Sequence, residues 1–310
     1  MAERSSPDRP LVAIVGPTAV GKSEVALELA ERFQGEIVSA DSRQIYRGMD
    51  IGTAKPTPEE RARVPHHLID VTDPDRPLTL AEYQRMAYEA IEGIHRRGRL
   101  PFLVGGTGLY VWAVVEGWQI PPAPPDPELR RALEERARRE GPQALYEELR
   151  RLDPEAASFI DPRNVRRVIR ALEVCYQTGK PFSAQRRKNP PPYRTLLIGL
   201  TRPRAELYRR IDERVERMIA QGLVEEVRRL AERYPWDLPA MTGLGYRQIG
   251  AHLRGEISLE EAIRQIQSAT RDFVHHQYNW FRLNDPRIRW FDLSREDVEA
   301  IAAWLKEQLR

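Results

Sequence analysis

The stretch "LVAIVGPTAVGKS", Leu11–Ser23, decides the fold. Its five apolar residues Leu11–Val15 have the length of a buried strand, and a helical pattern begins at Lys22. Between the two, Gly16–Ser23 matches Gly-x-x-x-x-Gly-Lys-[Ser/Thr], the pattern of a phosphate-binding loop, in the strand–loop–helix context that the pattern requires. The stretch predicts an α/β domain that binds a polyphosphate, which need not be a nucleotide.

The loop offers several groups to an anion. Its backbone N–H groups and the N-terminus of the following helix converge on one point. The Lys22 ammonium adds positive charge, and the Ser23 hydroxyl is the predicted protein ligand for Mg²⁺. The phosphate-binding residues expected here are Gly16, Pro17, Thr18, Ala19, Val20, Gly21, Lys22 and Ser23.

Apolar runs and helical patterns alternate along most of the chain, which predicts a parallel sheet flanked by helices. The expected strands are Leu11–Val15, Glu36–Ala40, Leu100–Val104, Thr195–Leu200 and Ile288–Leu293. The expected helices include Lys22–Phe33, Leu80–Arg97, Arg204–Ala220, Leu223–Arg233 and a long late helix that begins after Ser258.

Two proline-rich breaks, Trp118–Glu128 and Lys188–Arg194, interrupt this alternation, because proline fits neither a helix interior nor a central strand. The pattern between them is wholly helical, and one helix is expected to start at Asp161 and to stop at Gly179. We therefore expect residues 1–120 and 195–310 to form the α/β core and residues 121–194 to form an inserted all-helical domain.

Composition excludes several classes of protein. With 41% hydrophobic and 31% charged residues, the 310-residue chain can bury a core, and its apolar runs are far shorter than a membrane span. The polar segment Met1–Pro10 has no secretory signal, and the single Cys175 fits a reducing compartment. We expect a cytoplasmic protein without membrane contact, and a monomer by default. The predominance of arginine over only five lysines weakly suggests nucleic acid.

The strand expected at Leu100–Val104 is followed by Gly105-Gly106-Thr107-Gly108. Hydrolytic NTPases carry at this point an aspartate that holds Mg²⁺ and orients water, so the glycines favour group transfer over hydrolysis. Asp41 ends the second expected strand, at the edge where ligands of parallel sheets bind. It is either a turn residue or a general base acting beside the bound phosphate.

The spacing alone leaves two functions open for Asp41. In a small-molecule kinase the loop would hold ATP, and Asp41 would take a hydroxyl proton. In an alkyl transferase the loop would hold the diphosphate of the donor, and the acceptor would attack carbon.

Six further segments occur in order around the loop: Ser39–Thr57 (SADSRQIYRGMDIGTAKPT), Val64–Asp70 (VPHHLID), Gly105–Tyr110 (GGTGLY), Asn164–Val174 (NVRRVIRALEV), Gly243–Gln248 (GLGYRQ) and Gln277–Arg282 (QYNWFR). Together they closely resemble the bacterial type of the tRNA dimethylallyltransferase family. The resemblance covers about Leu11–Leu293, nearly the whole chain. It implies a P-loop α/β fold with a helical insertion.

The resemblance implies transfer of a dimethylallyl group from dimethylallyl diphosphate to N6 of adenosine 37 in tRNA, with Mg²⁺ as cofactor. Asp41 would be the general base on the amine, and Thr107 matches the threonine in the channel where base and donor meet. The loop, Lys22 and an arginine would stabilise the leaving diphosphate. Arg214 is the best match for that arginine, and Arg210, one turn earlier, is the alternative.

The resemblance also implies RNA contacts. The adenine must be turned out of the stacked anticodon loop, and the residues expected to grip it are Asp41, Ser42, Arg43, Gln44 and Thr107. The matching segment of the insertion contains Arg166, Arg167, Val168, Ile169 and Arg170. On a helix, its arginines and Arg163 fall within about a 100° arc. The basic segment Arg186–Arg194 is expected to add phosphate contacts.

Two rival functions belong to other classes: a P-loop kinase of a nucleoside or small metabolite, and a non-catalytic RNA-binding ATPase. The arginine-rich helical insertion counts against the first, and the missing strand-end aspartate counts against the second. A plant-type relative that uses adenosine phosphates shares much of the α/β core, but the whole set of RNA-binding segments favours tRNA.

Overall fold

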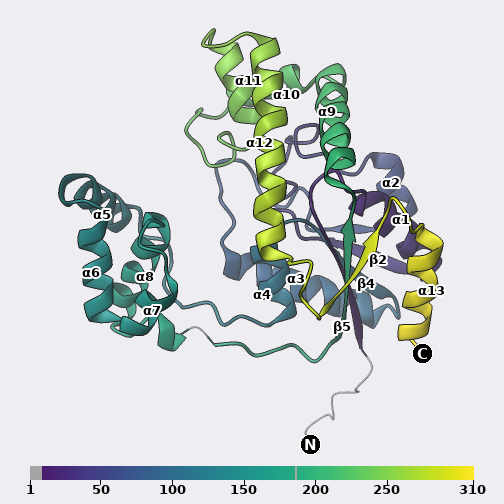
Figure 1. Cartoon of the computed structure of the whole chain (residues 1–310), viewed down its shortest axis with the longest axis horizontal. Helices are drawn as coiled ribbons and strands as arrows, with labels where there is room; N and C mark the ends of the chain where they lie inside the picture. The colour runs from purple at the N-terminus through teal and green to yellow at the C-terminus, as the bar shows by residue number, and fades with distance from the viewer. Residues whose placement is uncertain (1–8, 186) are drawn as a thin grey trace, which may run out of the picture. The chain divides into compact units, whose positions relative to one another are not determined.

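The structure is a computed structural model, and it describes residues 9–185 and 187–310 (Figure 1). The expectation about a secretory signal concerns a segment of which residues 1–8 lie outside this range, as does Arg186 of the basic segment. The chain divides into two compact units. We call Met1–Val115 with Pro191–Arg310 the core unit, and Glu116–Pro190 the helical unit.

Within the described residues, one sheet of six strands forms the centre of the core unit, in the order β3-β2-β4-β1-β5-β6, and every neighbouring pair is parallel. The strands are β1 (Pro10–Val15), β2 (Gly35–Ser39), β3 (His66–His67), β4 (Leu100–Val104), β5 (Arg194–Thr201) and β6 (Ile288–Asp292). The predicted parallel sheet is confirmed, and each of the five predicted strands is present. The short edge strand β3 was not predicted.

The helices of the core unit, in the part of the chain that the structure describes, are α1 (Lys22–Arg32), α2 (Pro58–Arg63), α3 (Leu80–Arg96), α4 (Gly108–Val115), α9 (Arg204–Ala220), α10 (Leu223–Ala231), α11 (Tyr246–Leu253), α12 (Leu259–Trp280) and α13 (Val298–Gln308). In Figure 1, α9, α10 and α11 lie above the sheet, and α12 runs from them down toward α4. No helix in the described residues combines the length and the apolar character needed to cross a bilayer.

The burial of β1 on both faces explains why its sequence is continuously apolar. Because β1 is a central strand covered on both faces, all of Leu11–Val15 is buried and the run shows no polar alternation. Val12 and Ile14 join Leu29 of α1 and Ile301 of α13 in the main hydrophobic cluster. The central position also brings the loop after β1 to the middle of the carboxyl edge of the sheet.

The helical unit contains α5 (Pro127–Glu140), α6 (Pro142–Leu152), α7 (Pro154–Phe159), α8 (Val165–Thr178) and the short 3₁₀ helix η1 (Ser183–Gln185). It has its own hydrophobic core, which includes Leu133, Leu145, Leu149, Val168, Ile169 and Leu172. Burial raises the pKa of the Cys175 thiol of α8.

The predicted start of the last long helix of this unit is wrong. Asn164, not Asp161, caps α8: its side chain accepts a hydrogen bond from the backbone of Arg167 at 3.2 Å. The Asp161 carboxylate instead pairs with Arg163, Nη2 to Oδ2 2.7 Å. The predicted stop is confirmed, since Gly179 follows α8 with a left-handed φ of 65°.

Candidate active site

Three loops meet at the carboxyl edge of the sheet. They follow β1 (the phosphate loop), β2 (from Asp41) and β4 (from Gly105), and β4 lies between the other two strands. A Cβ atom at Gly105 would lie 2.1 Å from the carbonyl oxygen of Ala40, so glycine is what lets the last two loops pack together. Thr107 then donates its backbone N–H to Ala40 at 3.2 Å.

The phosphate loop has the backbone that its glycines predict. Gly16 has φ 144° and Gly21 has φ 113°, both in the region that favours glycine, and a Cβ at Gly16 would lie 2.4 Å from the carbonyl oxygen of Leu200. Of the predicted phosphate-binding residues, those that line the adjacent cavity are Thr18, Ala19, Gly21, Lys22 and Ser23. Gly16, Pro17 and Val20 are buried and shape the loop.

Lys22 bonds to its own loop. Its ammonium donates to the carbonyl oxygens of Gly16 at 3.0 Å and Pro17 at 2.7 Å. Burial, and next the positive charge of Arg214, lower the pKa of Lys22 to about 7, although Asp41 acts in the opposite direction. A lysine whose pKa is lowered to this extent is readily protonated when an anion binds nearby.

Two arginines of α9 reach the loop in different ways. Arg210 donates from Nε to the carbonyl oxygen of Ala19 at 2.8 Å and lies 3.5 Å from a carboxylate oxygen of Glu24. Arg214 makes one long hydrogen bond, from Nη1 to the Thr18 hydroxyl at 3.4 Å. Burial lowers the pKa of Arg214, and Asp41 opposes that shift. Arg214 therefore has more donors left for an anion than Arg210.

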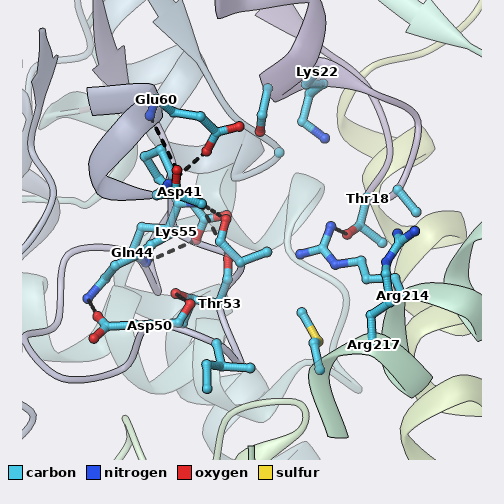
Figure 2. Close-up of a pocket in the computed structure, with 18 of the residues that line it drawn as sticks. Thr18, Lys22, Asp41, Gln44, Asp50, Thr53, Lys55, Glu60, Arg214 and Arg217 are labelled. Carbon is cyan, nitrogen blue, oxygen red and sulfur yellow. Dashed lines mark hydrogen bonds and ion pairs between the residues drawn. The ribbon is translucent and has the colours of Figure 1, made fainter. Parts of the chain in front are cut away.

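Asp41 forms a turn, which is one of the two roles that the sequence left open for it. Its Oδ1 accepts backbone hydrogen bonds from Arg43 at 2.8 Å and Gln44 at 3.4 Å, which is a turn-forming arrangement. In the part of the chain that the structure describes, Oδ2 has no hydrogen-bond partner, and the side chain lines the cavity. Figure 2 shows Asp41 on the opposite side of that cavity from Thr18 and Arg214. One oxygen thus holds the turn while the other faces the site.

Thr107 and Ser42 fix the start of this turn. The Thr107 hydroxyl accepts the Ser42 backbone N–H at 3.0 Å and donates to the Ser42 hydroxyl at 3.3 Å. Arg43, predicted to contact RNA, donates to the carbonyl oxygen of Pro239 at 2.8 Å.

Gln44, also predicted to grip the base, uses its amide inside the protein. Its Nε2 donates to the carbonyl oxygens of Thr53 and Ala54 at 3.3 and 3.2 Å, and its Oε1 accepts from Ser39 at 3.0 Å. The amide thereby holds the loop that follows Tyr46.

Two adjoining cavities lie at this edge. The larger, of about 1140 Å³, is lined by the phosphate loop, Asp41 and Arg214. The smaller, of about 330 Å³, shares Asp41 and Arg214, adds Thr107 and has an apolar wall made by Ile211, Val215, Met218, Leu223, Ile266 and Phe273. A ligand with a charged head and a short apolar group finds both environments side by side.

The sequence analysis missed two buried polar residues at this site. Gln277 of α12 is 4% exposed and connects the phosphate loop to Gly106. Glu226 of α10 is 2% exposed and accepts hydrogen bonds from the backbone N–H groups of Asp50, Ile51 and Gly52, at 3.0, 2.8 and 3.1 Å. Each occupies the buried stripe of its helix, where apolar residues are expected, and this was the available signal.

The oxygen-bearing side chains on the cavity wall fit a magnesium ion that is held mainly by the oxygens of a bound phosphate compound. No group of three His, Cys, Asp or Glu residues in 9–185 and 187–310 is arranged to hold a metal. Ser23 is exposed at the start of α1, and both Ser23 and Asp41 line the cavity. Mg²⁺ in phosphate sites takes one or two protein oxygens and fills its remaining positions with water and phosphate oxygens.

The predicted RNA-binding segment of the helical unit has two kinds of residue. Val168 and Ile169 are 1% and 3% exposed and belong to the core of the unit. Arg170 donates to the buried carboxylate of Glu173 at 2.6 Å. Arg166 and Arg167 are exposed, so they are the side chains of this segment most accessible to a ligand.

The core unit therefore presents a phosphate loop, a carboxylate oxygen without a partner among the described residues, and an apolar wall at one edge of a parallel sheet. The residues that follow β4 supply no hydrolytic aspartate. These features define a P-loop enzyme of group transfer.

Comparison with known proteins identifies the family. The family model described as IPP transferase matches residues 44–284, and the one described as isopentenyl transferase matches residues 10–72. The tRNA dimethylallyltransferase of Thermomicrobium roseum is 59% identical over 93% of this chain and 87% of its own length. The chain belongs to the tRNA dimethylallyltransferase family, as predicted, and is thus a prenyltransferase.

Solved structures support this family assignment and the fold. A tRNA isopentenylpyrophosphate transferase from Bacillus halodurans has a TM-score of 0.73 and 43% identity, with 97% of each chain covered. A eukaryotic dimethylallyltransferase acting on tRNA has a TM-score of 0.82 and 27% identity, with 96% of this chain and 78% of that chain covered. The predicted P-loop fold is confirmed.

Proposed function

We propose that this enzyme transfers the dimethylallyl group of dimethylallyl diphosphate to N6 of adenosine 37 in tRNA and releases diphosphate. One observation carries the proposal: Asp41, Lys22 and Arg214 line one cavity, which adjoins an apolar wall. The names of the relatives supply the substrate class, since they are transferases of tRNA.

The diphosphate binds to the phosphate loop. Backbone N–H groups of the loop, Lys22 and Arg214 donate to its oxygens, while Arg210 holds the loop through Ala19. Ser23 would hold Mg²⁺, which would supply positive charge next to the leaving group. These groups stabilise the negative charge that develops on the diphosphate as it departs.

The C5 group lies along the apolar wall of the smaller cavity. The bond from its C1 to the diphosphate oxygen breaks, and both electrons leave with the diphosphate. The N6 lone pair forms the new bond to C1, and the proton lost from N6 passes to Oδ2 of Asp41. Thr107 acts through Ser42 to keep the Asp41 turn in place.

The RNA contacts come from both units. The inserted domain, predicted at residues 121–194, binds tRNA phosphates through Arg166 and Arg167. Ser42, Arg43 and Thr107 line the smaller cavity beside Asp41 and surround the turned-out adenine. Gln44 contributes by holding the loop at Thr53. We expect the reaction to occur in the cytoplasm, with the enzyme as a monomer.

The test is a defined reaction. Purified enzyme is incubated with Mg²⁺, dimethylallyl diphosphate and an unmodified tRNA that carries adenosines at positions 36, 37 and 38, and the RNA is then weighed by mass spectrometry. We expect a gain of one C5 unit at position 37, and no gain in a matched tRNA with guanosine there. No gain in either RNA, together with phosphorylation of a nucleoside by ATP, would establish the kinase function instead.

A further inference from the structure

Gln277 connects two of the three loops that form the site. Its side-chain oxygen accepts the backbone N–H of Thr18 at 2.8 Å, and its side-chain nitrogen donates to the carbonyl oxygen of Gly106 at 3.1 Å. The side chain lines both cavities although the residue is only 4% exposed. Both ends of the amide are therefore used, one on the phosphate loop and one on the loop after β4.

Gly106 is shaped for this contact. A Cβ atom built there would lie 2.2 Å from the Gln277 side-chain nitrogen, which is closer than any real contact. The amide therefore enters a space that only glycine leaves open. The same comparison at Gly108 gives 2.2 Å to the side chain of Trp280, so α12 packs tightly against both Gly106 and Gly108.

The two connected loops carry opposite halves of the proposed reaction. Thr18 touches Arg214 and belongs to the loop proposed to hold the leaving diphosphate. Gly106 precedes Thr107, whose hydroxyl fixes the start of the Asp41 turn, where the amine proton is proposed to go. The Gln277 side chain thus joins the donor half to the acceptor half.

We infer that Gln277 is a positioning residue for alkyl transfer. This inference rests on the proposed function, because it requires a nucleophile and a leaving group on opposite sides of the transferred carbon. Such a displacement depends on alignment, and a misplacement of about 1 Å costs on the order of 10² in rate. Both ends of the Gln277 amide bond to the protein, so Gln277 acts through the Thr18 and Gly106 backbones and not by bonding a substrate.

The first test replaces Gln277 by a residue of similar length without hydrogen bonds, Gln277→Met. We expect kcat in prenyl transfer to fall about 10–100-fold, while the KM for dimethylallyl diphosphate changes less than about threefold. Gln265→Met is the matched control, because Gln265 is an exposed glutamine of the same helix whose side chain, among the described residues, bonds only to Glu261, at 2.8 Å. The control should keep wild-type kinetics.

A purely structural role would give a different pattern. It would lower the melting temperature and the fraction of enzyme that binds inorganic diphosphate, measured by calorimetry, but would leave kcat per folded site unchanged. Rates are therefore normalised to diphosphate-binding sites.

The second test is Gln277→Glu, which keeps an acceptor for the Thr18 N–H and changes the group that faces the Gly106 carbonyl. An ionised glutamate repels that carbonyl, whereas a protonated one donates to it. We expect the activity of this variant, relative to wild type at the same pH, to recover as the pH falls from 8 to 6. Gln277→Met should show no such recovery.

The third test is Gly106→Ala, alone and combined with Gln277→Met. Because the added methyl group displaces the same amide, the two losses in kcat should overlap and not multiply. Fully multiplicative losses, or an unchanged kcat in Gln277→Met alongside an active wild type, would overturn the inference and leave the proposed function standing. A wild-type enzyme that transfers no C5 group would overturn both.

Discussion

The Lys22 ammonium donates to the carbonyl oxygen of Pro17 at 2.7 Å, so the cation of the phosphate loop bonds to the loop itself. Burial and Arg214 lower the pKa of this lysine to about 7. A bound diphosphate adds negative charge nearby, which favours the protonated amine and raises its pKa. Lys22 is therefore mostly neutral in the free enzyme at pH 8, mostly charged at pH 6, and charged at both pH values in the complex.

It follows that dimethylallyl diphosphate binding takes up a proton at Lys22 at pH 8 but hardly at pH 6. Calorimetry in buffers of different ionisation enthalpy measures this uptake. The control is Lys22→Arg, which stays charged throughout, while protonation of the ligand is common to both proteins. We expect the wild type to take up more protons than the variant at pH 8 and the same number at pH 6. If the wild type and the variant took up the same number of protons at pH 8 as well as at pH 6, the lowered pKa of Lys22 would be excluded.

Asp41→Asn should remove the base and preserve the turn. Asparagine keeps an oxygen that can accept the Arg43 backbone N–H, whereas the Oδ2 that faces the cavity becomes an amide unable to take a proton. We expect single-turnover prenyl transfer to slow by roughly 10²–10⁴, with tRNA affinity little changed. A near-normal single-turnover rate would rule Asp41 out as the base.

The two arginines of α9 should differ in importance. Arg214→Ala is expected to weaken binding of dimethylallyl diphosphate about 10–100-fold, since charge-assisted hydrogen bonds contribute about 1.5–3 kcal/mol. Arg210→Ala should have a smaller effect, because Arg210 is already bonded to Ala19 and acts on the loop only. Equilibrium binding of dimethylallyl diphosphate at fixed Mg²⁺ measures both affinities. A larger loss of affinity in Arg210→Ala than in Arg214→Ala would assign the diphosphate contact to Arg210.

Substitution of Arg166 should affect tRNA binding, whereas substitution of Arg170 should affect the stability of the fold. Arg166→Ala is expected to reduce the salt dependence of tRNA binding by about one unit of slope and to leave unfolding unchanged. Arg170→Ala takes a partner from the buried Glu173, which retains Arg130, and should lower the free energy of unfolding by about 1–3 kcal/mol. Filter binding across a salt series and urea unfolding measure the two effects. A slope unaffected by Arg166→Ala would remove this face of α8 from the RNA contacts.

Glu226→Ala should destabilise the loop at Asp50–Gly52. Its carboxylate accepts three backbone N–H groups and the Tyr246 hydroxyl, the last at 2.6 Å. Loss of this acceptor should cost at least about 3 kcal/mol, whereas Tyr246→Phe, which removes one donor, should cost about 1 kcal/mol. Urea unfolding gives both values, and limited proteolysis should show earlier cleavage in this loop. Equal stability losses in the two variants would show that the Glu226 carboxylate does not hold this loop through the three backbone N–H groups.

The parts of the fold that follow from local pattern were predictable. β1, the phosphate loop and α1 are contiguous in sequence, and the apolar runs of the other long strands identify themselves by length. β3 was missed because a two-residue edge strand made by His66 and His67 has no apolar run. The start of α8 was misplaced because Asp161 and Asn164 both suit a helix cap, and only the backbone shows which one is used.

The site was only partly predictable for a related reason. Asp41 and Lys22 follow strands that end at the same edge of the parallel sheet, so topology places both residues at that edge. Gln277 and Glu226 act on residues 259 and 174 positions away, and no local pattern specifies such partners. Gln44 shows the converse: its amide suits base recognition, but its partners are the carbonyl oxygens of Thr53 and Ala54.

The long separation between Thr18 and Gln277 has a consequence for synthesis on the ribosome. The phosphate loop leaves the ribosome well before Gln277, whose side chain fixes the loop and which lies 259 residues further along the chain. The helical unit draws its core from residues made in between and can finish folding first. A nascent chain that stops before α12 therefore carries the whole phosphate-binding motif and lacks the contact that holds it in place.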